Sequence, residues 1–201
     1  MENKQEECIL DIFCTIFDSS CILKHKSYSD AILSENGKEA KLKKIYIKDI
    51  KENNVVILHT DKSGLNEEGH KISNLFSIQK YGHNKSCDYV LIKKISEQEF
   101  EIYYIDLKSD KPTGFENQFK STKCFINYIK SLIEIFSSKK IVFTKERFIL
   151  FTTLKPRNTT NIFNKNNIEM GREISNPRKI PVTNKQEILY SRLINCYDMS
   201  I

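Results

Sequence analysis

Asp88, Asp106 and Lys108 are the residues whose types and spacing most clearly allow chemistry. They lie at the ends of two apolar runs, CDYVLIKK (87–94) and EFEIYYIDLK (99–108), which the polar linker ISEQ separates. Val, Ile and Tyr dominate both runs, and this composition is typical of β-strands. The two runs therefore predict a β-hairpin with charged residues at one end.

The geometry of a hairpin predicts that these charged residues meet. The start of the first strand faces the end of the second, and opposed residues lie about 5 Å apart. Because side chains alternate, Asp106 and Lys108 should project to one face while Leu107 points to the other. Two carboxylates, a backbone carbonyl and water suit Mg²⁺. A lysine beside such a metal can orient or deprotonate a water and stabilise the charge of a reacting phosphate.

This arrangement resembles the PD-(D/E)xK nuclease superfamily. Asp88 on one strand is followed by Asp106-Leu107-Lys108 on the next, and a helix follows. The stretch "KSCDYVLI…YYIDLKS…QFKST" is similar to small restriction-like, nuclease-like proteins of phage defence and mobile elements in prokaryotes. The resemblance covers roughly residues 85–192, and it implies a hydrolase that cleaves phosphodiesters.

The resemblance also implies roles for individual residues. Asp88 and Asp106 would bind Mg²⁺ or Mn²⁺ together with the backbone carbonyl of Leu107. Lys108 would position the attacking water. Gln118, on the following helix as in those proteins, would steady the scissile phosphate or the lysine. The product would carry a 5′-phosphate.

The pattern leaves alternatives open. Cys87 stands where a proline often precedes the first aspartate of the superfamily. A further acidic ligand commonly comes from an N-terminal helix, and Glu68 is the best candidate for it, with Glu67 next. Both are alternatively solvated loop residues. Asp88 and Asp106 are alternatively charged strand-edge residues that deter aggregation.

The charge distribution indicates a nucleic-acid partner. The net charge is +6, and residues 139–192 hold twelve Lys and Arg against four Asp and Glu. A basic segment of this kind is what phosphate binding requires, although a Lys- and Asn-rich coding bias would also produce it. The candidate phosphate contacts, each alternatively a solvated side chain, are Ser109, Lys155, Arg157, Arg172, Arg178 and Lys179.

The elements that must position the site follow from periodicity. Residues 55–60, VVILHT, predict a strand, and Asn36-Gly37 predicts a hairpin turn between strands of the segment 21–50. Residues 140–154 predict a further strand. A helix of about six turns is expected from apolar residues that recur at spacings of three and four. They are Phe115, Phe119, Thr122, Ile126, Ile129, Ile133 and Phe136.

For two other segments the sequence pattern fits more than one kind of secondary structure. Residues 5–17 fit a short amphipathic helix or a buried strand, and residues 61–74 a loop or a short helix. Residues 155–181 predict a long polar loop, and residues 187–193 a last strand. We therefore expect an α/β (α+β) fold: a central mixed β-sheet with one long amphipathic helix and an N-terminal β-rich extension.

The domain organisation and location are predicted from composition. We expect residues 1–80 to form a β-rich region of unknown role, continuous with a nuclease-like core and basic C-terminal segment at 81–201. No apolar run approaches the roughly 20 residues of a membrane helix, and the acidic start lacks the features of a secretory signal. Six cysteines without a paired spacing are expected to be free thiols, mostly buried, in the reducing cytoplasm.

Two functions from different classes remain. The first is a Mg²⁺- or Mn²⁺-dependent nuclease, with DNA favoured over RNA as the substrate. The second is a catalytically inactive protein of the same fold that binds nucleic acid, or that binds a protein partner or a second copy through its N-terminal region. An inhibitor of the immunity type would need an acidic surface, and the net charge argues against it. No membrane partner is expected.

Overall fold

The computed structural model describes residues 9–24, 30–35, 42–50, 54–61, 84–108, 113–153 and 171–194. Its helices are α1 (Ile9–Ile16), the 3-10 helix η1 (Ser19–Cys21), α2 (Phe115–Ser137) and α3 (Tyr190–Ile194). Its strands are β1 (Ile22–Lys24), β2 (Ala31–Ser34), β3 (Lys44–Lys48), β4 (Val55–His59), β5 (Tyr89–Lys94), β6 (Glu99–Lys108), β7 (Val142–Thr152), β8 (Arg178–Pro181) and β9 (Gln186–Leu189). Among these helices none is long and apolar enough to cross a membrane. The α+β fold class with one long helix is confirmed.

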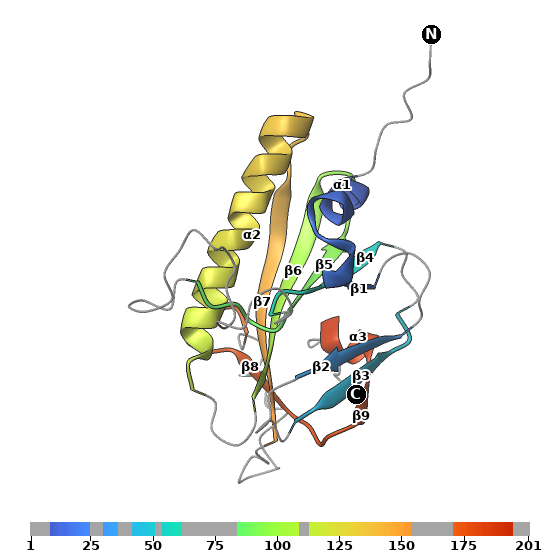
Figure 1. Cartoon of the computed structure of the whole chain (residues 1–201), viewed down its shortest axis with the longest axis vertical. Helices are drawn as coiled ribbons and strands as arrows, with labels where there is room; N and C mark the ends of the chain where they lie inside the picture. The colour runs from blue at the N-terminus through green and yellow to red at the C-terminus, as the bar shows by residue number, and fades with distance from the viewer. Residues whose placement is uncertain are drawn as a thin grey trace.

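A six-stranded mixed sheet in the order β1-β4-β5-β6-β7-β8 forms the centre of the protein (Figure 1). Within this sheet the pairs β1–β4, β4–β5 and β5–β6 are antiparallel. β7 runs parallel to β6, and β8 runs parallel to β7. A parallel neighbour needs a crossover, and α2 supplies it between β6 and β7. The predicted hairpin is the β5–β6 pair, at the middle of this sheet.

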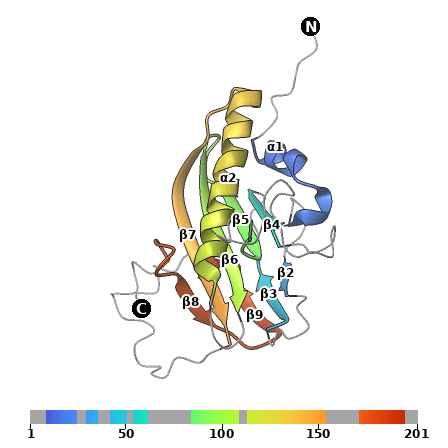
Figure 2. The same ribbon diagram turned by 60° about the vertical axis from the view of Figure 1, so that its left-hand side comes forward.

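The helix α2 forms where the apolar stripe predicts it. Phe119, Thr122 and Ile126 are among its buried residues, and the stripe continues through Ile129 and Ile133. Phe136 was expected on the same face, but its side chain is 83% exposed. The last turn of α2 reaches past the tip of the β5–β6 hairpin (Figure 2).

The two faces of the central sheet pack into separate cores. Along β6, Tyr104 lies in the cluster that contains α1 and α2, whereas Ile105 lies in the cluster on the other face. Because strand side chains alternate, Asp106 and Lys108 fall on the α2 face. This alternation agrees with the predicted orientation of the two residues.

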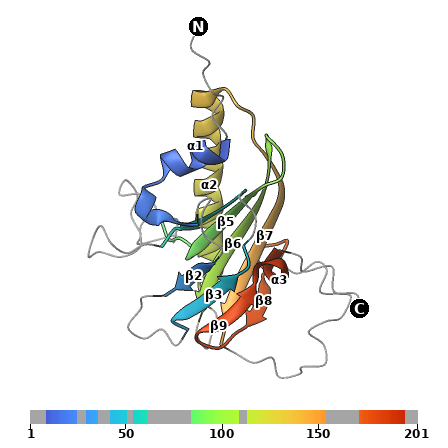
Figure 3. The same ribbon diagram turned by 90° about the vertical axis from the view of Figure 1, so that its right-hand side faces the viewer.

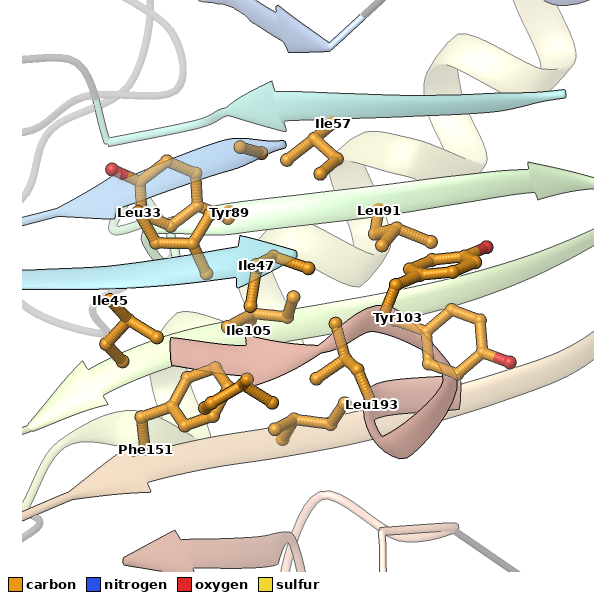
Figure 4. Packing of buried hydrophobic residues seen from close by; sticks show 14 of the residues in the cluster. Leu33, Ile45, Ile47, Ile57, Tyr89, Leu91, Tyr103, Ile105, Phe151 and Leu193 are labelled. Carbon is orange, nitrogen blue, oxygen red and sulfur yellow. The ribbon is translucent and has the colours of Figure 1, made fainter. Parts of the chain in front are cut away.

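A second sheet, in the order β2-β3-β9, covers the face opposite α2 (Figure 3). β2 and β3 are antiparallel, and β9 lies parallel to β3. Figure 4 shows Leu33, Ile45 and Ile47 of this sheet packed against Tyr89 and Ile105 of the central one. Residues from both sides of position 80 thus contribute to both sheets.

Several uncertain segments are now assigned. The described part of residues 5–17 is a helix, α1. The long loop expected at 155–181 is wrong at its end, because β8 adds to the edge of the central sheet. The strand expected at 187–193 is correct only to Leu189, since Tyr190–Ile194 forms a helix whose Leu193 and Ile194 enter the core. The predicted turn at Asn36-Gly37 and nearly all of 61–74 lie outside the described residues.

Candidate active site

Asp88 and Asp106 are direct neighbours across the β5–β6 pair. Tyr89 pairs with Ile105 at the end of the ladder, so the residue before the first faces the residue after the second. Asp88 is 6% exposed and Asp106 is fully buried. The hairpin therefore brings the two carboxylates together, as the sequence predicts.

One backbone N–H and one ammonium contact the two carboxylates. Asp88 Oδ2 accepts a hydrogen bond from the backbone N–H of Leu107 at 2.5 Å. Lys108 Nζ forms an ion pair with Asp106 Oδ2 at 3.1 Å. Neither oxygen of Asp106 otherwise has a hydrogen-bond partner within the described part of the chain. Buried carboxylate oxygens without donors are rare in native proteins, and they are the groups that a bound cation would satisfy.

The charges of the site interact strongly. Burial raises the pKa of Asp88 well above its usual value, and the neighbouring Asp106 raises it further. Burial likewise raises the pKa of Asp106, against the opposing effect of Lys108. Burial by itself would lower the pKa of Lys108, but Asp106 and Asp88 outweigh it and the pKa is raised. Lys108 is therefore a charged hydrogen-bond donor at neutral pH.

Two further carboxylates, Asp61 and Glu35, lie in the electrostatic reach of this pair. Burial, followed by the charge of Asp88, raises the pKa of Asp61 to about 8. Burial and then Asp88 also raise the pKa of Glu35, while Lys108 lowers it. The backbone N–H groups of Thr60 and Asp61 both donate to the Asp88 carbonyl, at 2.9 and 3.4 Å.

Sequence reasoning missed both residues. Asp61 directly follows the predicted strand 55–60, so a carboxylate at a strand end was visible there. Glu35 gave no such signal, because the second sheet brings it to the site from 53 positions away in sequence from Asp88. The residue that sequence reasoning offered as a third acid, Glu68, lies outside the described residues, as does Glu67.

Tyr89 connects the second sheet to the end of the central sheet that carries the two aspartates. Its hydroxyl donates to the Ser34 carbonyl and accepts from the Ser34 N–H, both at 2.7 Å. The ring also stacks on His59, with centroids 4.5 Å apart. One phenol thus satisfies both backbone groups of the residue that precedes Glu35.

Replacing Tyr89 with phenylalanine should lower the free energy of unfolding by about 1 to 3 kcal/mol. Two hydrogen bonds are lost, and the backbone N–H and carbonyl of Ser34 are left without their partner. Urea denaturation followed by circular dichroism would measure the change. Tyr128→Phe, on the exposed side of α2, is the matched control and should leave stability within about 0.5 kcal/mol. Equal stability of Tyr89→Phe and the wild type would show that the two hydrogen bonds to Ser34 do not stabilise the fold.

Gln118 anchors α2 to the segment that leads into Asp88. Its Nε2 donates to the Ser86 carbonyl at 3.0 Å. One turn later, Thr122 Oγ1 accepts from the Cys87 N–H at 2.8 Å and donates to the Gln118 carbonyl at 2.9 Å. The glutamine thus lies on the helix that follows the hairpin, as predicted, and its described bond is to the backbone beside the carboxylates.

The predicted phosphate contacts fall into three groups. Arg172 and Lys179 are exposed. Arg178 Nη1 donates to the carbonyls of Arg192 and Leu193 at the end of α3, at 3.4 and 3.5 Å, so its described contacts are structural. Ser109, Lys155 and Arg157 lie outside the described residues.

Lys179 lies in the same row of the sheet as Asp106. Asp106 pairs with Leu150, and Leu150 pairs with Lys179 on the next strand. Adjacent strands are about 4.8 Å apart, so the backbones of the two residues are separated by about 10 Å. The exposed Lys179 thus places a basic side chain two strands away from the carboxylates.

The donor set fits a hydrated divalent cation. Within the described ranges, no three His, Cys, Asp or Glu side chains converge so that they could hold a metal ion. Asp88 and Asp106 would therefore be the direct side-chain ligands, with water and the Leu107 carbonyl completing the shell. Mg²⁺ commonly binds through one or two carboxylates and keeps several waters.

Comparisons with known proteins give no relative. No protein-family model, no curated protein and no solved structure matches this chain. The site must therefore be interpreted from its own residues.

Proposed function

We propose that this protein is a metal-dependent phosphodiesterase of the PD-(D/E)xK nuclease type that acts on DNA or RNA, with DNA favoured. The observation that carries the proposal is the buried pair Asp88–Asp106 with Lys108 at 3.1 Å. Burying two adjacent ionised carboxylates disfavours folding unless protonation or nearby positive charge compensates, and such arrangements are typical of functional sites.

The order of elements around the pair supports the same proposal. An antiparallel β4–β5–β6 meander is followed by α2 and then by β7 parallel to β6. This is the strand, strand, helix and strand layout that the resemblance implies. A restriction or defence role and a cytoplasmic location follow from the resemblance alone and remain part of the proposal.

The residues of the chain would divide the work as follows. Bound Mg²⁺ or Mn²⁺ supplies positive charge that polarises the scissile phosphate and acidifies water. Asp88 and Asp106 bind that cation, and the Leu107 N–H holds Asp88 in position. Charged Lys108 donates a hydrogen bond to the attacking water or to the phosphate oxygen where negative charge increases. Water oxygen joins phosphorus, the P–O3′ bond breaks, the 3′ oxygen takes up a proton and a 5′-phosphate remains.

The test is cleavage of single-stranded DNA, double-stranded DNA and RNA with Mg²⁺, with Mn²⁺ and with EDTA. We expect metal-dependent cleavage by the wild type and a loss of at least 100-fold in Asp106→Ala. Glu97→Gln changes an 80% exposed carboxylate on the same hairpin and should retain full activity. Cleavage that survives EDTA or Asp106→Ala would contradict the proposal. Binding of nucleic acid without cleavage would favour the inactive, nucleic-acid-binding alternative.

A further inference from the structure

We propose that Glu35 is an outer ligand of the cation site: its carboxylate accepts a hydrogen bond from a water that the cation keeps. The proposal rests on the proposed function, because it assumes that Asp88 and Asp106 bind the cation directly. It gives the second sheet a part in the site, and it assigns Glu35 a role that the sequence pattern does not indicate.

Hydrogen bonds hold the backbone of Glu35 and of the residue before it. The Glu35 N–H donates to the carbonyl of Lys43, the residue before β3, at 3.1 Å, which extends the β2–β3 pairing by one residue. On the other side, Tyr89 holds both backbone groups of Ser34. Since Tyr89 is the residue after Asp88, the same short segment of β5 positions the aspartate and the residue before Glu35.

The Glu35 carboxylate interacts with the charges of the site. Its Oε2 atom is buried and accepts no hydrogen bond within the described part of the chain. Asp88 and Lys108 are the charged groups that act on it. Fully buried Asp106 gives the second, independent sign of a ligand, because apart from the ion pair of Oδ2 with Lys108 neither of its oxygens has a hydrogen-bond partner among the described residues.

Direct ligation by Glu35 does not fit, whereas ligation through water does. No three acidic side chains of the described ranges converge on one ion. Four carboxylates of the described residues, those of Glu35, Asp61, Asp88 and Asp106, nevertheless interact with the ammonium of Lys108. A cation that keeps its waters suits this arrangement, since its water hydrogens reach carboxylates too distant to bind it directly.

The test compares cations that differ in how they hold their ligands. Cobalt(III) hexaammine does not exchange its ammonia ligands and binds only through them, so it reports the outer sites alone. Isothermal titration calorimetry of the full chain should show Glu35→Gln weakening cobalt hexaammine and Mg²⁺ by about tenfold. Glu97→Gln should change neither affinity, and circular dichroism would confirm that each variant is folded.

The outcomes separate this inference from the proposed function. If Asp106→Asn abolishes Mg²⁺ binding while Glu35→Gln binds both cations like the wild type, the role of Glu35 is wrong and the proposed function stands. If the wild type binds neither cation, or if Asp106→Asn binds Mg²⁺ normally, both are wrong. If Glu35→Gln weakens both cations and Glu35→Asp recovers part of the loss, the inference holds.

Discussion

Replacing Lys108 with methionine is expected to lower kcat by about 100- to 1,000-fold while the protein still binds its metal. Lys108 Nζ lies 3.1 Å from Asp106, and the two aspartates keep its pKa raised, so the wild type presents a positive charge at neutral pH. Methionine keeps an unbranched side chain that is one atom shorter and removes that charge. The loss should fall on kcat rather than on KM, because the ammonium acts where charge develops in the transition state.

The affinity for Mg²⁺ in the same variant gives the second half of this prediction. Removing a cation beside Asp88 and Asp106 reduces the repulsion that Mg²⁺ meets, so calorimetry should show equal or tighter binding. Lys94→Met is the matched control, since Lys94 lies on the same hairpin and pairs with the exposed Glu97 at 2.6 Å. A kcat within threefold of the wild type would contradict the prediction and show that Lys108 serves only as the ion-pair partner of Asp106.

The metal-free protein is expected to lose stability as the pH rises from about 4 to about 8. The pKa of Asp61 is raised from 3.8 to about 8 by burial and by Asp88. Between these values the folded state holds a proton that the unfolded state has lost, so the free energy of unfolding falls with increasing pH. The stabilisation is complete below about pH 4 and lost above about pH 8. Because Asp61 is partly exposed, we expect a loss of about 1 to 3 kcal/mol.

Asp61→Asn separates this effect from other titrations. The amide stays neutral, so the variant should be more stable than the wild type at pH 9 and nearly equal to it at pH 4. Urea denaturation in EDTA at several pH values would measure both, with Glu97→Gln as the exposed control. Adding Mg²⁺ at pH 8 should restore stability to the wild type, because binding to the folded state alone shifts the equilibrium. A wild type whose stability increases steadily from pH 4 to pH 8 would contradict the prediction.

The part of the site that could be predicted from sequence is the part made by local pairing. Asp88 and Asp106 meet because a linker of only four residues joins the two strands, and a slip of one residue in their pairing would turn the apolar residues of one strand to the wrong face. The alternation that puts Lys108 on the face of Asp106 is equally local. The long helix was predictable for the same reason, since its pattern repeats within one segment.

The part that could not be predicted depends on contacts between distant segments. Glu35 reaches the site only because β2 pairs with β3 and because the phenol of Tyr89 holds Ser34. Neither contact leaves a periodic signal in the sequence. The segment Tyr190–Ile194 was predicted to be mostly strand, because a short apolar run fits a strand and a buried helical turn equally well. In the structure it is a single helical turn, from which Tyr190, Leu193 and Ile194 enter the core.

The parallel pairing of β3 with β9 has a consequence for the order in which the site is assembled. Ile45 pairs with Gln186, so this contact spans 141 positions, whereas Asp88 and Asp106 are 18 positions apart. A chain that emerges from the ribosome can form the aspartate pair early. β3 gains its second neighbour only once β9 has been made, and contacts of such separation form slowly. A nascent chain would therefore carry the hairpin carboxylates before the sheet that holds Glu35 beside them is complete.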